Sequence, residues 1–260
     1  MLNWFKNRRR KRIIEKPFPD AWRAIIDARL PYVAALPAPL RDELFDLSQI
    51  FIAEKSFEGC AGFQITDDVR VTIAAQACIL LLDRNTDIYR KLKTILVYES
   101  AFYANREEYD EDGLISVSND AHAGESWDIG VVILAWQEIL RGLRHKHDGY
   151  NVIIHEFAHQ LDQEDRNANG VPTLVHRDHY ARWQEVFSEH YAQLLKDVKR
   201  NRKTILDDYG TTNPAEFFAV ASESFFEESI KLKDRHPDLY QTLSHFYAQD
   251  PATYWQGIRT

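Results

Sequence analysis

The residues best suited to chemistry in this chain are His155, Glu156 and His159, which form the pattern H-E-x-x-H inside an apolar segment. Residues four apart lie on one face of a helix, so both imidazoles can reach a single metal ion. Glu156 would then lie beside the position that a water molecule takes on that ion. The pattern is typical of the active-site helix of a zinc-dependent peptidase.

A catalytic zinc ion takes three protein ligands and keeps its fourth position for water, so a third ligand is expected downstream. The longer pattern that ends in a third histidine fails, because Asp162 and Asp165 stand where its glycine and histidine would be. Glu216 and Glu223 instead lie about two helical turns apart in an apolar segment, residues 213–226. An ionised glutamate is costly there unless it is paired or bound to metal. Spacing alone leaves both open, and the alternative is that both are solvated on a surface helix.

The motifs H-E-F-A-H-Q-L-D and N-P-A-E-F-F-A, with Tyr209 between them, resemble the Mlc titration factor A family of bacterial zinc peptidases. The catalytic domain of anthrax lethal factor is more distantly similar. The likeness to the titration factor runs from the early helices to the end of the chain. A G-E-S-W motif at residues 124–127 gives it weaker support.

The resemblance implies that one Zn²⁺ per chain is held by His155, His159 and Glu216. It also implies that Glu156 is the general base and that the phenol of Tyr209 donates to the oxyanion. Without the family, Tyr209 is equally well an ordinary turn residue. The fold that the resemblance implies is a gluzincin-like peptidase core, with a small mixed sheet, the H-E-x-x-H helix and surrounding helices.

Two acidic residues, Asp162 and Glu223, are candidates to form hydrogen bonds to the metal-ligating side chains and so orient them. The lethal factor pattern has a further acidic residue one turn after the ligand, where this chain has Val220. Asp162 follows His159 by three residues and His155 by seven, so it could accept an imidazole N–H and fix its tautomer. The alternative is that Asp162 is only a residue of the helix end.

The elements around these residues are predicted from apolar periodicity and turn signals. Helices are expected in the first and last thirds of the chain, over Asp20–Leu36, Pro39–Lys55, Asp67–Leu82, 148–164, 177–198, 213–230 and 236–248. Strands are expected between them, over Thr94–Ala104, Leu114–Ser118 and Gly130–Trp136. Strands in the middle and helices at both ends indicate an α+β fold.

The strand over 131–136 precedes the metal helix, and we expect it to be either the sheet edge that receives an extended peptide or an internal strand. The segment 164–176 is polar and is predicted to form a rim of the cleft. His176, at its end, and His179 could bind substrate, but the pattern assigns them no role.

Composition indicates one domain, residues 17–260, with a helical part over about 17–90 and a catalytic part over about 91–260. The 260 residues are 45% hydrophobic, which is enough for a full core. Residues 1–16 carry seven basic side chains and one acidic side chain, although the whole chain has a net charge of −8. They are predicted to be a basic tail, either a solvated extension or a contact with nucleic acid or an anionic membrane.

The chain shows the features of a cytoplasmic protein. No apolar segment follows the basic start, and none approaches the roughly 20 residues that span a bilayer, so neither a secretory signal nor a transmembrane segment is expected. Cys60 and Cys78 have no paired ligand spacing and are expected to be reduced thiols. No DNA-reading motif is evident, and direct DNA binding is not expected.

Two functions remain open at this stage. The first is a zinc peptidase acting on peptides, and an aminopeptidase by the family resemblance. The second, also implied by the resemblance, is an anti-repressor that binds and sequesters the transcriptional repressor Mlc of sugar-uptake genes. The intact general-base position of Glu156 favours the enzyme, whereas sequestration alone would not need it.

Overall fold

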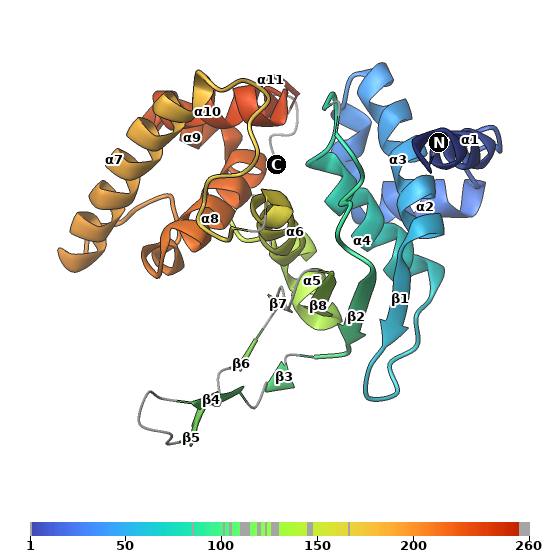
Figure 1. The fold of residues 1–260 in the computed structure, drawn as a ribbon, viewed down its shortest axis with the longest axis horizontal. Coiled ribbons are helices and arrows are strands. Elements are labelled where there is room, and N and C mark those ends of the chain that lie inside the picture. Colours follow the sequence, from blue (N-terminus) through green and yellow to red (C-terminus); the bar gives the residue numbers. More distant parts are fainter. Residues whose placement is uncertain are drawn as a thin grey trace.

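The computed structural model describes residues 2–84, 86–100, 102–103, 106–109, 115–118, 121–122, 124–125, 130–144, 148–165 and 167–254. Strands lie in the middle of the chain and helices at both ends, which confirms the α+β class. Figure 1 shows the amino-terminal helices on one side of the molecule and the carboxy-terminal helices on the other. Helix α6 (Val152–Asp162), which carries the H-E-x-x-H pattern, lies between the two groups.

The amino-terminal group is built from α2 (Asp20–Arg29), α3 (Ala38–Glu54) and α4 (Asp67–Ile79). The first of these is shorter than predicted, because proline disfavours helical geometry in the residue before it. A 3-10 turn, η1 (Pro31–Ala35), continues the chain there. Every residue of α4 from Val71 onward is buried, so this helix is the centre of the amino-terminal group.

The basic segment at the start of the chain forms helix α1 (Leu2–Ile14). The guanidinium of Arg10 donates to both carboxylate oxygens of Glu54 at 2.8 and 2.6 Å and lies 2.9 Å from Asp87. Ile13 and Ile14 pack against the core. A solvated extension is therefore the wrong interpretation for the described part of this segment. The division of the chain into a tail and one domain stays a prediction.

Four strands form the main sheet, in the order β1 (Ser56–Gly59), β2 (Thr94–Tyr98), β8 (Val131–Ala135) and β7 (Gly124–Glu125). The first three run parallel, and β7 is antiparallel to β8. β8 thus has a neighbour on each side, so its interpretation as the sheet edge is wrong. Among the described strands, the edge on the side of β8 is β7.

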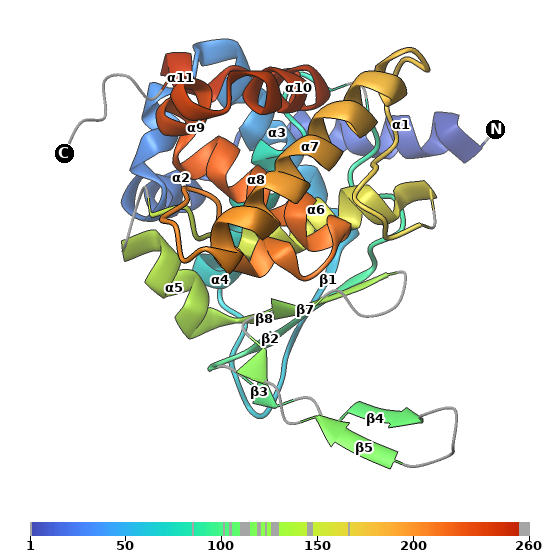
Figure 2. The same ribbon diagram turned by 90° about the vertical axis from the view of Figure 1, so that its left-hand side faces the viewer.

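The strand expected over Thr94–Ala104 ends at Tyr98, because Glu99 and Ser100 bend the chain. Two short antiparallel pairs follow. β3 (Phe102–Tyr103) pairs with β6 (Ala121–His122), and β4 (Arg106–Tyr109) pairs with β5 (Ile115–Ser118). Figure 2 shows the β4–β5 pair extending away from the helices.

The carboxy-terminal group surrounds one apolar helix, α8 (Pro214–Glu227), in which Phe217, Phe218 and Phe225 are almost fully buried. The helix expected over 213–230 breaks at Glu228 into α8 and α9. The other elements after the sheet are α5 (Trp136–Arg144), η2 (Gln163–Asp165), α7 (His179–Lys199), η3 (Asp208–Thr211), α9 (Ser229–Arg235), α10 (Pro237–Tyr247) and α11 (Pro251–Tyr254). Within the described ranges, no helix is both long and apolar enough to cross a membrane.

Candidate metal centre

The two histidines of the H-E-x-x-H pattern are positioned by the start of α6. The side chain of Asn151 caps the helix and accepts hydrogen bonds from the backbone N–H groups of Ile153 and Ile154, both at 3.1 Å. From this start, His155 and His159 fall one turn apart on the same face. Their Nε2 atoms lie 3.2 Å from each other. The sequence-predicted pair is thus brought together.

Glu216 reaches the same point from α8. Asn213 caps this helix by accepting from the backbone N–H of Glu216 at 3.0 Å, and Pro214 takes the first helical position. One carboxylate oxygen of Glu216, Oε2, lies 2.9 Å from Nε2 of His155 and 3.2 Å from Nε2 of His159. The first turn of α8 therefore faces the first turns of α6.

The three side chains fit a tetrahedral metal ion. Ligand atoms that bind zinc at about 2.1 Å with tetrahedral angles are about 3.4 Å apart, a little more than the 2.9–3.2 Å between these atoms. Among the described residues, His155, His159 and Glu216 are the one group of three or more His, Cys, Asp or Glu whose candidate ligand atoms all lie within 4.8 Å of one another. Two nitrogens and one oxygen are a donor set that zinc accepts.

Electrostatics also prepare Glu216 for a cation. Burial alone would raise the pKa of Glu216, but the hydrogen bonds and charges of His155 and His159 outweigh it and hold that pKa well below its usual range. Burial opposes a charge on His155, yet the pKa of His155 is raised well above its usual value by Glu223 and Glu216. The carboxylates thus give the centre a negative potential.

Glu223 lies behind His155. Its Oε1 is 2.7 Å from Nδ1 of His155, on the side of the ring opposite to Glu216. Its Oε2 accepts from the backbone N–H of Asn151 at 2.6 Å. With Nδ1 donating to Glu223, Nε2 is left as the atom that faces Glu216 and His159. Glu216 and Glu223 therefore hold different sides of one imidazole.

Glu156 is 4% exposed, and its Oε2 has no hydrogen-bond partner among the described residues. Burial raises the pKa of Glu156 to about 7, in spite of the nearby charges of His155 and His159. A carboxylate with a free oxygen and such a pKa is suited to accept and return a proton near neutral pH.

Tyr209 comes to the centre from η3. The side chain of Asp207 accepts from the backbone N–H of Tyr209 at 2.8 Å and fixes the start of this turn. The ring of Tyr209 is 5.9 Å from the ring of His155, centroid to centroid, and the residue is 54% exposed. The phenol therefore lies at the open side of the centre.

Asp162, for which two roles were considered, contacts the loop that follows α6. Its Oδ2 accepts from the backbone N–H of Gly170 at 2.8 Å, and its Oδ1 is buried without a partner among the described residues. No hydrogen bond to His155 or His159 is present. Burial raises the pKa of Asp162 to about 6.

Two residues of this region were not anticipated as positioning groups, Asn151 and Gly170. Besides capping α6, Asn151 donates through its side-chain nitrogen to Gln76 and Glu227, both at 2.8 Å. Its signal was an asparagine directly before an apolar helix. Gly170 has φ +75°, and a Cβ there would lie 2.3 Å from the carbonyl oxygen of Pro214. Only the folded chain shows that this close approach excludes a side chain.

The weak G-E-S-W motif is described only in part: Gly124 and Glu125 form β7, and the other two residues lie outside the described ranges.

Known proteins are similar to this chain over most of its length. An uncharacterized protein of Synechocystis is 44% identical over 251 residues, which cover 96% of this chain and 90% of that protein. Mlc titration factor A of Cronobacter sakazakii and that of Pectobacterium atrosepticum are each 32% identical over 235 residues. These alignments cover 86% and 89% of this chain and 88% and 87% of the relatives. Residues 4–248 match the family described as glucose-regulated metallo-peptidase M90. The chain therefore belongs to the M90 family of glucose-regulated metallo-peptidases.

Proposed function

We propose that the protein is a zinc-dependent peptidase in which His155, His159 and Glu216 hold the ion and Glu156 is the general base. The observation that carries the proposal is the convergence of three ligand atoms within 4.8 Å of one another, next to a buried carboxylate with an unpartnered oxygen. A structural zinc site is normally closed by four protein ligands. In the described part of the chain this group has three, as a catalytic site needs.

Each side chain has a separate task in this proposal. A bound Zn²⁺ supplies Lewis acidity, which acidifies a water molecule and polarises the scissile carbonyl. Glu156 takes the proton of the attacking water and returns it to the leaving amine. The phenol of Tyr209 donates to the oxyanion from the open side of the centre. Glu223 holds the ring of His155 in one orientation through Nδ1.

The peptide is proposed to bind along β7, the outer strand on the side of β8. An extended peptide can add to a sheet edge, where its backbone groups pair with those of the edge strand. β7 pairs with β8 in the sheet, and both strands contact α6. The choice of an aminopeptidase follows from the family resemblance. A cytoplasmic location is also part of this proposal.

The experiment measures zinc content and turnover of aminoacyl p-nitroanilides for the wild type, Glu156→Gln and Glu185→Gln. Glu185→Gln is the control, because the carboxylate of Glu185 pairs with Arg182 at the surface. We expect one zinc per chain in all three proteins. We expect kcat to fall by roughly 10²–10⁴ in Glu156→Gln only. Turnover that persists in Glu156→Gln would exclude this residue as the base. An N-acetylated substrate cleaved as fast as the free amine would exclude the aminopeptidase assignment.

A second function is favoured by the relatives named Mlc titration factor A. We propose that this chain also binds a repressor of the Mlc type, and that binding does not require Glu156. Calorimetric titration of purified Mlc with the wild type and with Glu156→Gln tests this. Equal affinities together with a loss of turnover would separate the two functions, whereas no binding by either protein would exclude the second one. In the alternative, a non-catalytic anti-repressor, the zinc-loaded wild type would bind Mlc and cleave no peptide.

A further inference from the structure

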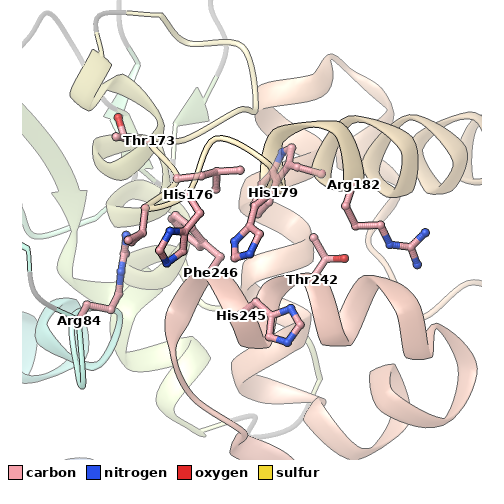
Figure 3. Close-up of a pocket in the computed structure, with 11 residues that line it drawn as sticks. Arg84, Thr173, His176, His179, Arg182, Thr242, His245 and Phe246 are labelled. Atoms are coloured by element: carbon pink, nitrogen blue, oxygen red, sulfur yellow. The ribbon is translucent and has the colours of Figure 1, made fainter.

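A second cluster of histidines lines a cavity of about 350 Å³, a volume in the range of small-molecule sites. The cavity lies between the start of α7, helix α10 and the loop before α7. His176 comes from the loop, His179 is the first residue of α7, and His245 comes from α10. Arg84, from the segment after α4, also lines the cavity (Figure 3). None of the metal-centre residues takes part.

This histidine pocket, as we call the cavity, differs from a metal site in its geometry. The ring centroids are 5.2 Å apart for His176 and His179, and 6.3 Å apart for His179 and His245. These three imidazoles do not form a group with candidate ligand atoms within 4.8 Å of one another, as the metal centre does. Among the described residues that line the cavity there is no carboxylate, so its polar groups are suited to an anion rather than to a cation.

Arg84 adds a positive charge that has no carboxylate within ion-pair distance among the described residues. Its guanidinium lies over the ring of Phe246 at 4.2 Å, and its one hydrogen bond among the described residues is to the carbonyl of Leu80 at 3.5 Å. Burial lowers the pKa of Arg84, and Glu164 acts on it only from beyond ion-pair distance. A desolvated cation gains from a negative partner, which a ligand in the cavity would supply.

Four other lining residues are apolar, and part of this surface is open to solvent: Leu174, Val175, Trp183 and Phe246. Val175 is 89% exposed, which is unusual for a large aliphatic side chain in a loop that borders a cavity. Trp183 and Phe246 form the buried floor. A ligand with a carbon skeleton beside its anionic group would cover this surface, which a free inorganic ion would leave exposed.

We propose that the histidine pocket binds a small phosphate monoester, with its phosphoryl oxygens on Arg84, His176, His179 and His245 and its carbon skeleton on Val175. Donors that approach from three separate segments of the chain suit the tetrahedral phosphoryl group better than the planar carboxylate. The amino terminus of α7, at His179, adds a favourable dipole.

The test is calorimetric titration of the zinc-loaded full chain with phenyl phosphate, with inorganic phosphate and benzoate as comparison ligands. We expect one binding event for phenyl phosphate, at least about fivefold tighter than for either comparison ligand. The variants are Arg84→Met and the double variant His176→Gln/His179→Gln. The double variant changes only exposed residues, so it should fold even if Arg84→Met does not. The matched control is Arg182→Met, because Arg182 lines the cavity but pairs with Glu185 at 3.0 Å. Figure 3 shows its guanidinium directed away from the histidines.

We expect the affinity for phenyl phosphate to fall at least tenfold in both pocket variants and to change less than twofold in Arg182→Met. Equal binding by the wild type and the double variant would overturn the proposal. So would binding that disappears in His159→Ala, because the ligand would then lie on the catalytic metal. A second equivalent of Zn²⁺ that the wild type binds and the double variant does not would also overturn it, in favour of a metal site. None of these outcomes depends on peptidase turnover, so the proposed function is tested separately.

Discussion

The metal centre and the histidine pocket are two histidine clusters of the described residues, and they differ in their neighbours. In the metal centre, carboxylates reach His155 from two sides, at 2.9 Å from Glu216 and 2.7 Å from Glu223. In the histidine pocket, the neighbours include two arginines and aromatic rings, and no carboxylate is among the described lining residues. Imidazole can ligate a cation as a neutral acceptor or hold an anion as a donor. The comparison teaches that the residues around a histidine decide which of these roles it takes.

Among the substitutions that test this difference between the metal centre and the histidine pocket, Glu216→Ala is expected to have the largest effect. If Glu216 is a direct ligand, its loss should weaken Zn²⁺ binding by more than about 100-fold, the upper range for residues that only support a ligand. Turnover should disappear with the zinc. Zinc is measured by competition with a chromophoric chelator. Phenyl phosphate should still bind as in the wild type, because Glu216 does not line the histidine pocket. A variant that keeps stoichiometric zinc would exclude Glu216 as a ligand.

Tyr209→Phe should affect the reaction but not the metal. If the phenol donates to the oxyanion, its removal should lower kcat by about 10²–10³, with KM and zinc content little changed. Steady-state kinetics on an aminoacyl p-nitroanilide give this result, and Tyr180→Phe is the control at another partly exposed tyrosine. A kcat within threefold of the wild type would exclude the phenol of Tyr209 as a donor to the oxyanion.

Glu223→Gln should have an effect between those of a ligand and of a surface residue. Glutamine keeps the acceptor for the backbone N–H of Asn151 but removes the charge that faces Nδ1 of His155. Zinc affinity should fall by about 10–100-fold, the usual cost of a lost partner behind a metal ligand. Chelator competition measures it, and unchanged affinity would show that the orientation of His155 does not depend on this charge.

The smallest effect is expected at Asp162, which ties α6 to the loop that leads to the histidine pocket. Burial raises the pKa of Asp162 to about 6, so the folded metal-free protein holds this proton more tightly than the unfolded chain does. The stability that the group contributes is therefore complete below about pH 4 and is lost as the pH rises through about 6. Asp162→Asn is neutral at every pH and still accepts from Gly170.

We therefore expect the Tm of metal-free Asp162→Asn, relative to that of the wild type, to rise by about 3 °C between pH 5 and pH 7.5. Thermal melts followed by circular dichroism at both pH values measure the difference. An identical shift at the two pH values would mean that Asp162 does not titrate in this range.

The local part of the site could be predicted from the sequence, because helical periodicity fixes it. His155 and His159 follow each other by four residues, so any helix through them brings their rings to one face. Asn213 and Pro214 likewise indicate where α8 begins, because asparagine favours the N-cap and proline the first helical position. The exact start of α6 was not, since the predicted range began three residues before its cap.

What only the tertiary structure decided is how separate elements approach each other. Spacing left Glu216 and Glu223 as equal candidates, and the packing of α8 on α6 brings one to Nε2 of His155 and the other to Nδ1. The same holds for the histidine pocket, whose residues come from three segments far apart in the chain. A sequence pattern constrains neighbours along one helix, whereas distances between elements follow from the packing of the whole core.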